Sequence, residues 1–271
     1  MKKIKLSITK ATVSVSTTGT ACALDCKHCG RHYLEHMISL SELAKKESIL
    51  KGTKSLLISG GSTLEGKVPI LEHIDEIKAL KSKGYRLNFH VGLVDEKEAS
   101  EISKIASAIS FDFVGDDETI RYVYNLDKTV EDYIKTFELL RTYTKKIYPH
   151  ITVGLMCGKL GHEFRAIDIL SRYDHEKIVF IVFIPTANTT FEKCSPPSIQ
   201  DVRRVFEYAR SKFNCELILG CMYPKGNLRD EIGFAAIDNN FNTITQPSPR
   251  VIERLKNEGY SIEWSDECCV L

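Results

Sequence analysis

The stretch Thr20-Ala-Cys-Ala-Leu-Asp-Cys-Lys-His-Cys-Gly30 follows a strand-like run at residues 12–17 and sets three cysteines in a C-x3-C-x2-C spacing. Cys22, Cys26 and Cys29 therefore lie on one short loop. Three thiolates on such a loop can bind three corners of a cubane iron–sulfur cluster and leave the fourth iron without a protein ligand. Because an iron with an open position can bind and activate a small molecule, the loop indicates catalysis more than electron storage.

Strand-like and helical patterns alternate outward from this loop along the whole chain. β-branched or apolar runs occur at residues 12–17, 55–59, 85–91, 108–114, 150–155, 178–184, 216–219 and 242–245. Helical patterns lie between them and after the last one, which is typical of repeated βαβ units and a parallel sheet. Eight such units predict a single (β/α)8 TIM-like barrel over residues 1–260. Residues 261–271 form a Cys-containing tail that we expect to pack on the barrel, as an extra strand or as a cover for an opening.

Composition limits the partners and the compartment. The 37 Lys and Arg residues nearly balance the 36 Asp and Glu residues, and no basic block indicates nucleic-acid binding. No apolar stretch approaches the length of a membrane span, and the N-terminus lacks the features of a signal peptide. We therefore expect a cytoplasmic protein, in which nine cysteines serve as thiols or metal ligands more than as disulfides.

The cysteine loop after the first predicted strand resembles that of the radical S-adenosylmethionine superfamily. In that family the residue before the third cysteine is usually aromatic, and His28 fits. The resemblance implies a 4Fe-4S cluster whose open iron chelates the amino and carboxylate groups of S-adenosylmethionine. Cleavage of the sulfonium by an electron from the cluster, supplied by a donor such as ferredoxin or flavodoxin, would release a 5′-deoxyadenosyl radical that takes hydrogen from a substrate.

Other candidate cofactor-binding residues follow predicted strands, because a barrel places its chemistry at the carboxyl ends of its strands. The turn of Gly60, Gly61 and Ser62 resembles a Gly-Gly-Glu-like turn whose backbone meets the methionine amino group in the family. Gly158 belongs to a segment, residues 153–163, that resembles the family's adenine-cradling segment.

Four polar residues near the ends of the third and fourth strands are candidates for binding ribose, a carboxylate or the substrate: Asn88, His90, Glu118 and Arg121. Two of them have plainer interpretations. Glu118 can cap the following helical turn, and Arg121 can face solvent.

More narrowly, the chain is similar to biotin synthase-like members, and its Gly220-Cys-Met-Tyr-Pro segment and C-terminal Cys-Cys pair resemble an archaeal-type group that contains one subunit of a two-protein lipoyl synthase. That resemblance implies sulfur insertion into an octanoyl chain on a carrier protein, together with a paralogous radical enzyme. The inserted sulfur would come from a second iron–sulfur cluster. Its candidate ligands are Cys157 and Cys221, which follow strand ends, and Cys268 and Cys269, on a tail that can fold over the barrel mouth.

Two alternatives remain open. One is a radical reaction without sulfur transfer, such as a rearrangement, C–C cleavage or methylation in cofactor synthesis. The other is a zinc-binding structural module, since Cys26 and Cys29 are followed by His32 and His36. Zinc would leave Cys22 unused, and a βα barrel needs no zinc to fold.

Overall fold

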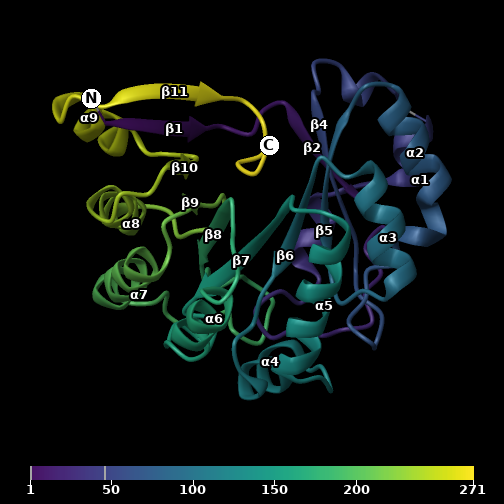
Figure 1. Cartoon of the computed structure of the whole chain (residues 1–271), viewed down its shortest axis with the longest axis horizontal. Coiled ribbons are helices and arrows are strands. Elements are labelled where there is room, and N and C mark those ends of the chain that lie inside the picture. Colours follow the sequence, from purple (N-terminus) through teal and green to yellow (C-terminus); the bar gives the residue numbers. More distant parts are fainter. Residues whose placement is uncertain (1, 46) are drawn as a thin grey trace.

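The computed structural model describes residues 2–45 and 47–271 (Figure 1). The strands are β1 Lys3–Ser7, β2 Thr12–Ser16, β3 Ile38–Ser39, β4 Ser55–Ser59, β5 Arg86–Val91, β6 Ala108–Asp112, β7 Ile147–Val153, β8 Lys177–Val182, β9 Glu216–Leu219, β10 Thr243–Thr245 and β11 Ser261–Ser265. The α-helices are α1 Leu40–Lys45, α2 Ile74–Ser82, α3 Glu96–Ile105, α4 Asp117–Tyr124, α5 Val130–Tyr143, α6 Glu163–Leu170, α7 Ile199–Lys212, α8 Asn227–Asp238 and α9 Pro249–Asn257. Short 3-10 helices cover His32–His36, Glu47–Leu50 and Ile70–His73.

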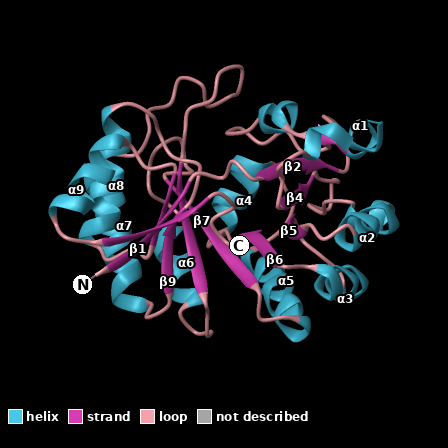
Figure 2. Cartoon of the chain, turned by 90° about the horizontal axis from the view of Figure 1, so that it is seen from above, coloured by secondary structure: helices cyan, strands magenta, loops and turns pink. Residues whose placement is uncertain are grey.

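The strands form one sheet in the order β11-β1-β10-β9-β8-β7-β6-β5-β4-β2-β3, and every pairing between them is parallel. The sheet curls, its helices cover the outer face, and the C-terminus lies within the curve in both views (Figures 1 and 2). The α/β class and the parallel sheet agree with the sequence prediction.

The predicted closed barrel of eight strands is not what the sheet forms. Its eight predicted strands correspond to β2 and to β4 through β10, but β1 and β11 continue the sheet beyond β10. β3 continues it beyond β2, so the sheet is a curled half-barrel of 11 strands with two ends. The physical reason is that strand-forming residues also occur before the predicted units (β1), after them (β11) and between the first two of them (β3), and these pair with the free edges.

Local signals at the helix ends hold the outer layer in place. The Asp95 carboxylate accepts from the N–H of Glu98, and the Glu98 carboxylate accepts from the N–H of Asp95, which makes a capping box at the start of α3. Thr129 and Asp132 form the same arrangement at the start of α5.

None of the helices in the described residues combines the length and apolar character that spanning a membrane requires.

Candidate functional site

The cysteine loop follows β2 and is tied to three other segments by backbone hydrogen bonds. Lys27 N donates to Val123 O at the end of α4 (2.8 Å), and Ala23 N donates to Ser62 O in the turn after β4 (2.8 Å). Phe191 N, in the loop after β8, donates to Lys27 O (3.0 Å). The loop is therefore fixed among segments that follow strand ends, at the mouth of the curled sheet.

The three thiols of this loop lie close enough to affect one another. Burial, and then the neighbouring thiols Cys29 and Cys22, raise the pKa of Cys26 to about 12. Burial also raises the pKa of Cys29. Three neighbouring thiolates without a positive charge would repel each other, so this donor set fits a bound cationic iron core.

The turn of Gly60, Gly61 and Ser62 packs directly on the cysteine loop. Ser62 N donates to Cys22 Sγ at 3.3 Å, and Gly61 N donates to Thr18 Oγ1 at 2.7 Å. A Cβ on Gly61 would lie 2.0 Å from Ala21 O and 2.6 Å from Cys22 Cβ. The structure thus brings the predicted turn to the predicted loop, and only glycine fits at the contact.

His28 packs as an aromatic residue. Its ring lies edge-on to Tyr124, with 5.2 Å between ring centroids, and its buried Nδ1 has no hydrogen-bond partner. Burial lowers the pKa of His28 to about 4, so the ring is neutral at physiological pH.

The geometry does not support the zinc alternative. Among the described residues, no three His, Cys, Asp or Glu side chains converge as the ligands of one metal ion do. Cys26, Cys29, His32 and His36 therefore do not form a mononuclear site. In a cubane cluster each cysteine binds a different iron, so Cys22, Cys26 and Cys29 need not converge on one point.

Deeper in the curl, three adjacent strands contribute a charged pair and a second imidazole. His90 Nε2 on β5 lies 3.2 Å from Asp112 Oδ1 on β6, and the His90 ring is 5.4 Å from that of His150 on β7. Burial alone would lower the pKa of His90 and raise that of Asp112. Their mutual attraction outweighs burial, raises the pKa of His90 and lowers that of Asp112 to about 2.

His150 stays neutral because burial, and then the charge of His90, lower its pKa to about 4. Its Nδ1 lies 2.9 Å from Tyr148 O, and a carbonyl can only accept, so Nδ1 carries the proton. The side chains of His90 and Asp112 remain 30% and 39% exposed although the surrounding protein shifts their pKa values. They therefore face the open interior of the curl.

Asn88 lies deeper than the sequence analysis placed it. Its side chain is 1% exposed, accepts from Ser110 Oγ (3.0 Å) and donates to Cys268 Sγ (3.5 Å). Asn88 is the third residue of β5 and sits below His90, among the tail residues. It is thus a contact of the tail, and its position does not suit a cofactor at the mouth.

The tail lies at the end of the curl opposite the cysteine loop. Cys268 N donates to Thr12 Oγ1 at the start of β2 (2.7 Å), and Lys177 Nζ at the start of β8 donates to Val270 O (3.2 Å). The expectation of an extra strand is confirmed by β11, whereas the cysteines of the tail do not fold over the mouth. β11 ends at Ser265, opposite Ser7 of β1, and Ala11 N then donates to Asp266 O (2.7 Å), so the chain leaves β11 beside the residues that precede β2.

Two of the four auxiliary-cluster candidates, Cys268 and Cys269, are neighbours on this floor, and a third, Cys221, lies within electrostatic range of Cys268. The Cys269 thiol donates to Cys268, which is the largest factor that lowers the pKa of Cys268 to about 6 and raises that of Cys269. Burial, and then the charge of Cys268, raise the pKa of Cys221 to about 11 although its residue is exposed. The charge of the Cys268 thiolate thus reaches Cys221.

The fourth candidate, Cys157, lies elsewhere. It forms a disulfide with Cys194, with a Cα–Cα distance of 5.3 Å, between the loops that follow β7 and β8. This corrects its predicted role as a cluster ligand, while the other seven cysteines are free thiols, in line with the expectation that thiols outnumber disulfides. The two cysteines pair because Gly158, whose missing side chain leaves room for Ser195 O, brings the two loops into contact. Cys215 lies before β9, at the opposite end from the mouth, as a partly buried thiol.

Glu118 and Arg121 lie on exposed positions of α4. Arg121 pairs with Asp117 across one helical turn at 3.9 Å, which agrees with the plainer interpretation of this residue. The loop that contains Gly158 is held by Glu163, whose buried carboxylate accepts from Gly154 N (2.7 Å) and Gly161 N (2.6 Å).

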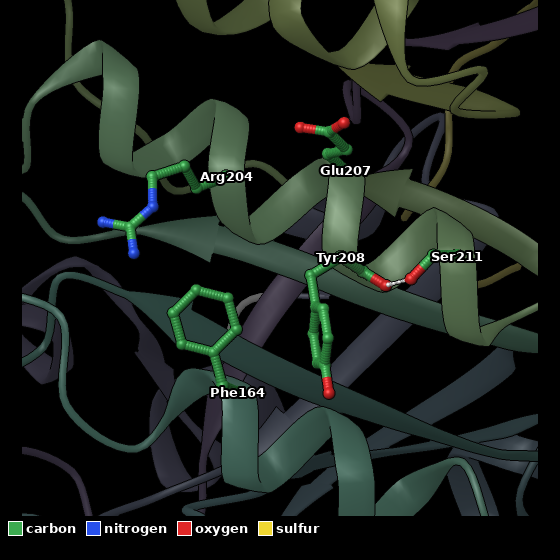
Figure 3. Close-up of a pocket in the computed structure, with 5 residues that line it drawn as sticks. All are labelled: Phe164, Arg204, Glu207, Tyr208 and Ser211. Carbon is green, nitrogen blue, oxygen red and sulfur yellow. Dashed lines mark hydrogen bonds between the residues drawn. The ribbon is translucent and has the colours of Figure 1, made fainter.

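Sequence reasoning missed several residues that shape the interior, among them His150 and the pairing of His90 with Asp112. The sequence contained part of the signal, because His90, Asp112 and His150 lie on three consecutive predicted strands and can therefore face one another. A shallow hollow between α6 and α7 contains no predicted site residue (Figure 3); it is lined by Phe164, Arg204, Glu207, Tyr208 and Ser211. It lies in the outer helical layer, away from the cysteine loop and from the floor of the curl.

No family model and no curated protein matches this sequence. Solved structures do match its fold. Methylornithine synthase PylB aligns at a TM-score of 0.63 and 12% identity over 96% of this chain and 84% of PylB. The anSMEcpe structure with bound AdoMet aligns at 0.53 and 15% identity over 86% and 63% of the two chains. Streptococcus suis SuiB bound to S-adenosylmethionine aligns at 0.57 and 13% identity over 85% and 52%.

These structural neighbours are radical S-adenosylmethionine enzymes. The chain spans most of PylB but about half to two thirds of the other two. At this identity the likeness shows the fold: the chain has the fold of radical S-adenosylmethionine enzymes, as the sequence predicted.

Proposed function

We propose that the protein is a radical S-adenosylmethionine enzyme that binds a 4Fe-4S cluster through Cys22, Cys26 and Cys29. The observation that supports this most is the packing of Gly61 on the cysteine loop, with Ser62 N donating to Cys22 Sγ. The C-x3-C-x2-C spacing and a glycine turn from the next strand thus meet at the mouth of a fold that such enzymes share.

The residues at the mouth fit the proposed cluster. Cys26 and Cys29 are held as neutral thiols by burial and mutual repulsion, and iron would replace their protons. The N–H of Ser62 would stabilise the Cys22 thiolate. When bound, the cluster supplies an electron and an open coordination position for S-adenosylmethionine.

The surrounding side chains determine what reaches this position. His28 and Tyr124 present aromatic surface beside the loop. Below them, His90 and Asp112 present a fixed charged pair to the interior, and His150 holds its Nδ1 proton on Tyr148 O. These groups can orient polar atoms of the cofactor or the substrate.

Within the same proposal we infer sulfur insertion, because Cys268 and Cys269 are neighbours on the floor of the curl and Cys221 lies within electrostatic range of Cys268. These three thiols could hold three corners of a second iron–sulfur cluster, with a further ligand supplied by another group. Cys157 is not part of this set. The substrate predicted from the sequence resemblance is an octanoyl chain on a carrier protein, with a paralogous radical enzyme as the partner.

The first experiment measures iron and acid-labile sulfide per chain in protein purified without oxygen. Wild type is compared with the triple variants Cys22→Ala/Cys26→Ala/Cys29→Ala and Cys221→Ala/Cys268→Ala/Cys269→Ala. We expect about eight irons in wild type and about four in each variant. The alternative result is about four irons in wild type, all of which are lost in the first variant and none in the second. That result would support radical chemistry, would contradict sulfur insertion, and would favour a rearrangement, C–C cleavage or methylation. Unchanged iron in the first variant would contradict the whole proposal.

A further inference from the structure

The last six residues, 266–271, close the floor of the curled sheet. They contact the first residue of three strands that are far apart in the sequence: Thr12, Arg86 and Lys177. Cys269 and Val270 pack in a small apolar cluster with Ala108, Tyr148, Val179 and Ile218. The tail is thus a separate layer beneath the strands and carries the two tail thiols, Cys268 and Cys269.

A single ion pair anchors the residue that precedes these thiols. The Glu267 side chain is 9% exposed, and both of its oxygens accept from Arg86, Oε1 from Nε at 3.1 Å and Oε2 from Nη2. Its carbonyl accepts from Ser7 Oγ at 2.5 Å. Bidentate pairing with arginine fixes orientation as well as distance.

The position of Glu267 determines where the next thiol points. Cys268 N donates to Thr12 Oγ1, and Cys268 Sγ accepts from Asn88 Nδ2 at 3.5 Å. Arg86 and Asn88 are two residues apart on β5, so both lie on the same face of that strand. One strand therefore holds the carboxylate with its first residue and the thiol with its third.

We propose that Arg86 is a positioning residue for the two tail thiols: by pairing with Glu267 it seats the tail and holds Cys268 and Cys269 on the floor of the sheet. The inference rests on the proposed function at one point, the assignment of these thiols as ligands of the auxiliary cluster. Arg86 touches neither the cluster nor a substrate and acts through the tail.

Loss of Arg86 would leave the Glu267 carboxylate buried without a partner, which is strongly unfavourable. A hollow at the outer surface offers this carboxylate a way to water; it is lined by Thr53, Lys54, Lys83, Gly84, Tyr85, Arg86 and Glu267. The tail would follow Glu267 outward and remove Cys268 from Asn88. The nearby pair of Lys54 and Asp266 is no substitute, because both side chains are well exposed, at 57% and 43%.

The test compares full-length wild type with Arg86→Gln and with Lys54→Gln, the matched control that breaks the exposed pair on the same tail. The first readout is the rate at which iodoacetamide alkylates Cys268 and Cys269 after chelator treatment, measured by peptide mass spectrometry with Cys215 as internal reference. We expect alkylation in Arg86→Gln to be about tenfold faster, equivalent to about 1.4 kcal/mol, and unchanged in Lys54→Gln.

The second readout is iron per chain in anaerobically reconstituted protein. Arg86→Gln should lose only the auxiliary iron, and the charge-reversed variant Arg86→Glu/Glu267→Arg should restore both readouts. Wild-type alkylation rates in Arg86→Gln would overturn the inference, as would full auxiliary iron. If wild type itself binds no auxiliary iron, the proposed sulfur chemistry fails, and the alkylation rates still decide whether Arg86 seats the tail.

Discussion

At the scale of single residues, the contact between Gly61 and the cysteine loop decides how closely the two segments approach. Replacing Gly61 with Ala adds one methyl group where Ala21 O and the Cys22 side chain already lie, so backbone has to move. We expect Gly61→Ala to lower iron at the mouth cluster to below half of wild type. Ser62→Ala is the control: it keeps the N–H that donates to Cys22 Sγ, so its iron content should match wild type. Normal iron in Gly61→Ala would show that the turn does not support the loop.

The pair of His90 and Asp112 predicts a pH dependence with two limits. The stabilisation from Asp112 is present above the ordinary pKa of about 3.9 and is lost as pH falls toward the folded value of about 2. The stabilisation from His90, whose pKa is raised, is complete below about 6.5 and is lost as pH rises through the folded value. The pair therefore stabilises the protein most at mildly acidic pH.

Asp112→Asn should then lower the free energy of unfolding by about 1 kcal/mol near pH 6, a small amount because both side chains are partly open to water. The difference from wild type should shrink below pH 3. In NMR titrations of metal-free protein the pKa of His90 should fall relative to wild type, since burial is then opposed only by the charge of Cys268. Asp168→Asn, on the outer helix α6, should leave that titration unchanged; an equal His90 pKa in wild type and Asp112→Asn would refute the pairing.

At the scale of elements, the loop between β7 and α6 depends on one buried carboxylate. Both oxygens of Glu163 accept from backbone N–H groups, those of Gly154 and Gly161. In Glu163→Gln one oxygen becomes an NH2 group that cannot accept, so one N–H loses its partner. We expect a loss of about 1–3 kcal/mol in denaturant unfolding and weaker binding of S-adenosylmethionine by calorimetry. Unfolding at the wild-type denaturant concentration would show that the loop is held by other contacts.

The same scale shows how much of the fold the sequence could predict. Hydrophobic runs located eight strands because buried parallel strands are apolar along their length. β7 begins at Ile147, whereas the sequence predicts the strand from residue 150. The prediction begins late because proline usually indicates a strand edge, and Pro149 in fact lies inside the strand. The alternation of lysine and apolar residues in β1 was a usable strand signal. Its pairing with β10 was not predictable, because contacts between the two ends of the chain leave no local pattern.

At the scale of the whole molecule, the cysteines divide between two ends of the curled sheet. The loop of Cys22, Cys26 and Cys29 could be predicted at the mouth, because it follows the first predicted strand and its spacing is local. The tail thiols could not be placed, because the sequence gives no sign that the chain leaves β11 beside the residues that precede β2 and so delivers the tail to the floor. The same argument explains Asn88: alternation predicts the face of a strand but not the depth along it.

The disulfide between Cys157 and Cys194 gives the last prediction, because it separates two cysteines from the metal-binding sets. Titration of metal-free protein under denaturing conditions, without reductant, should find seven free thiols, those of Cys22, Cys26, Cys29, Cys215, Cys221, Cys268 and Cys269. The double variant Cys157→Ser/Cys194→Ser should have a free energy of unfolding about 3 kcal/mol lower than wild type, since the bond closes a long loop of the unfolded chain. It should keep the iron content of wild type, because neither sulfur belongs to a cluster. Nine free thiols together with lost iron in the variant would return Cys157 to the ligands of the auxiliary cluster and would place that cluster at the mouth instead of the floor.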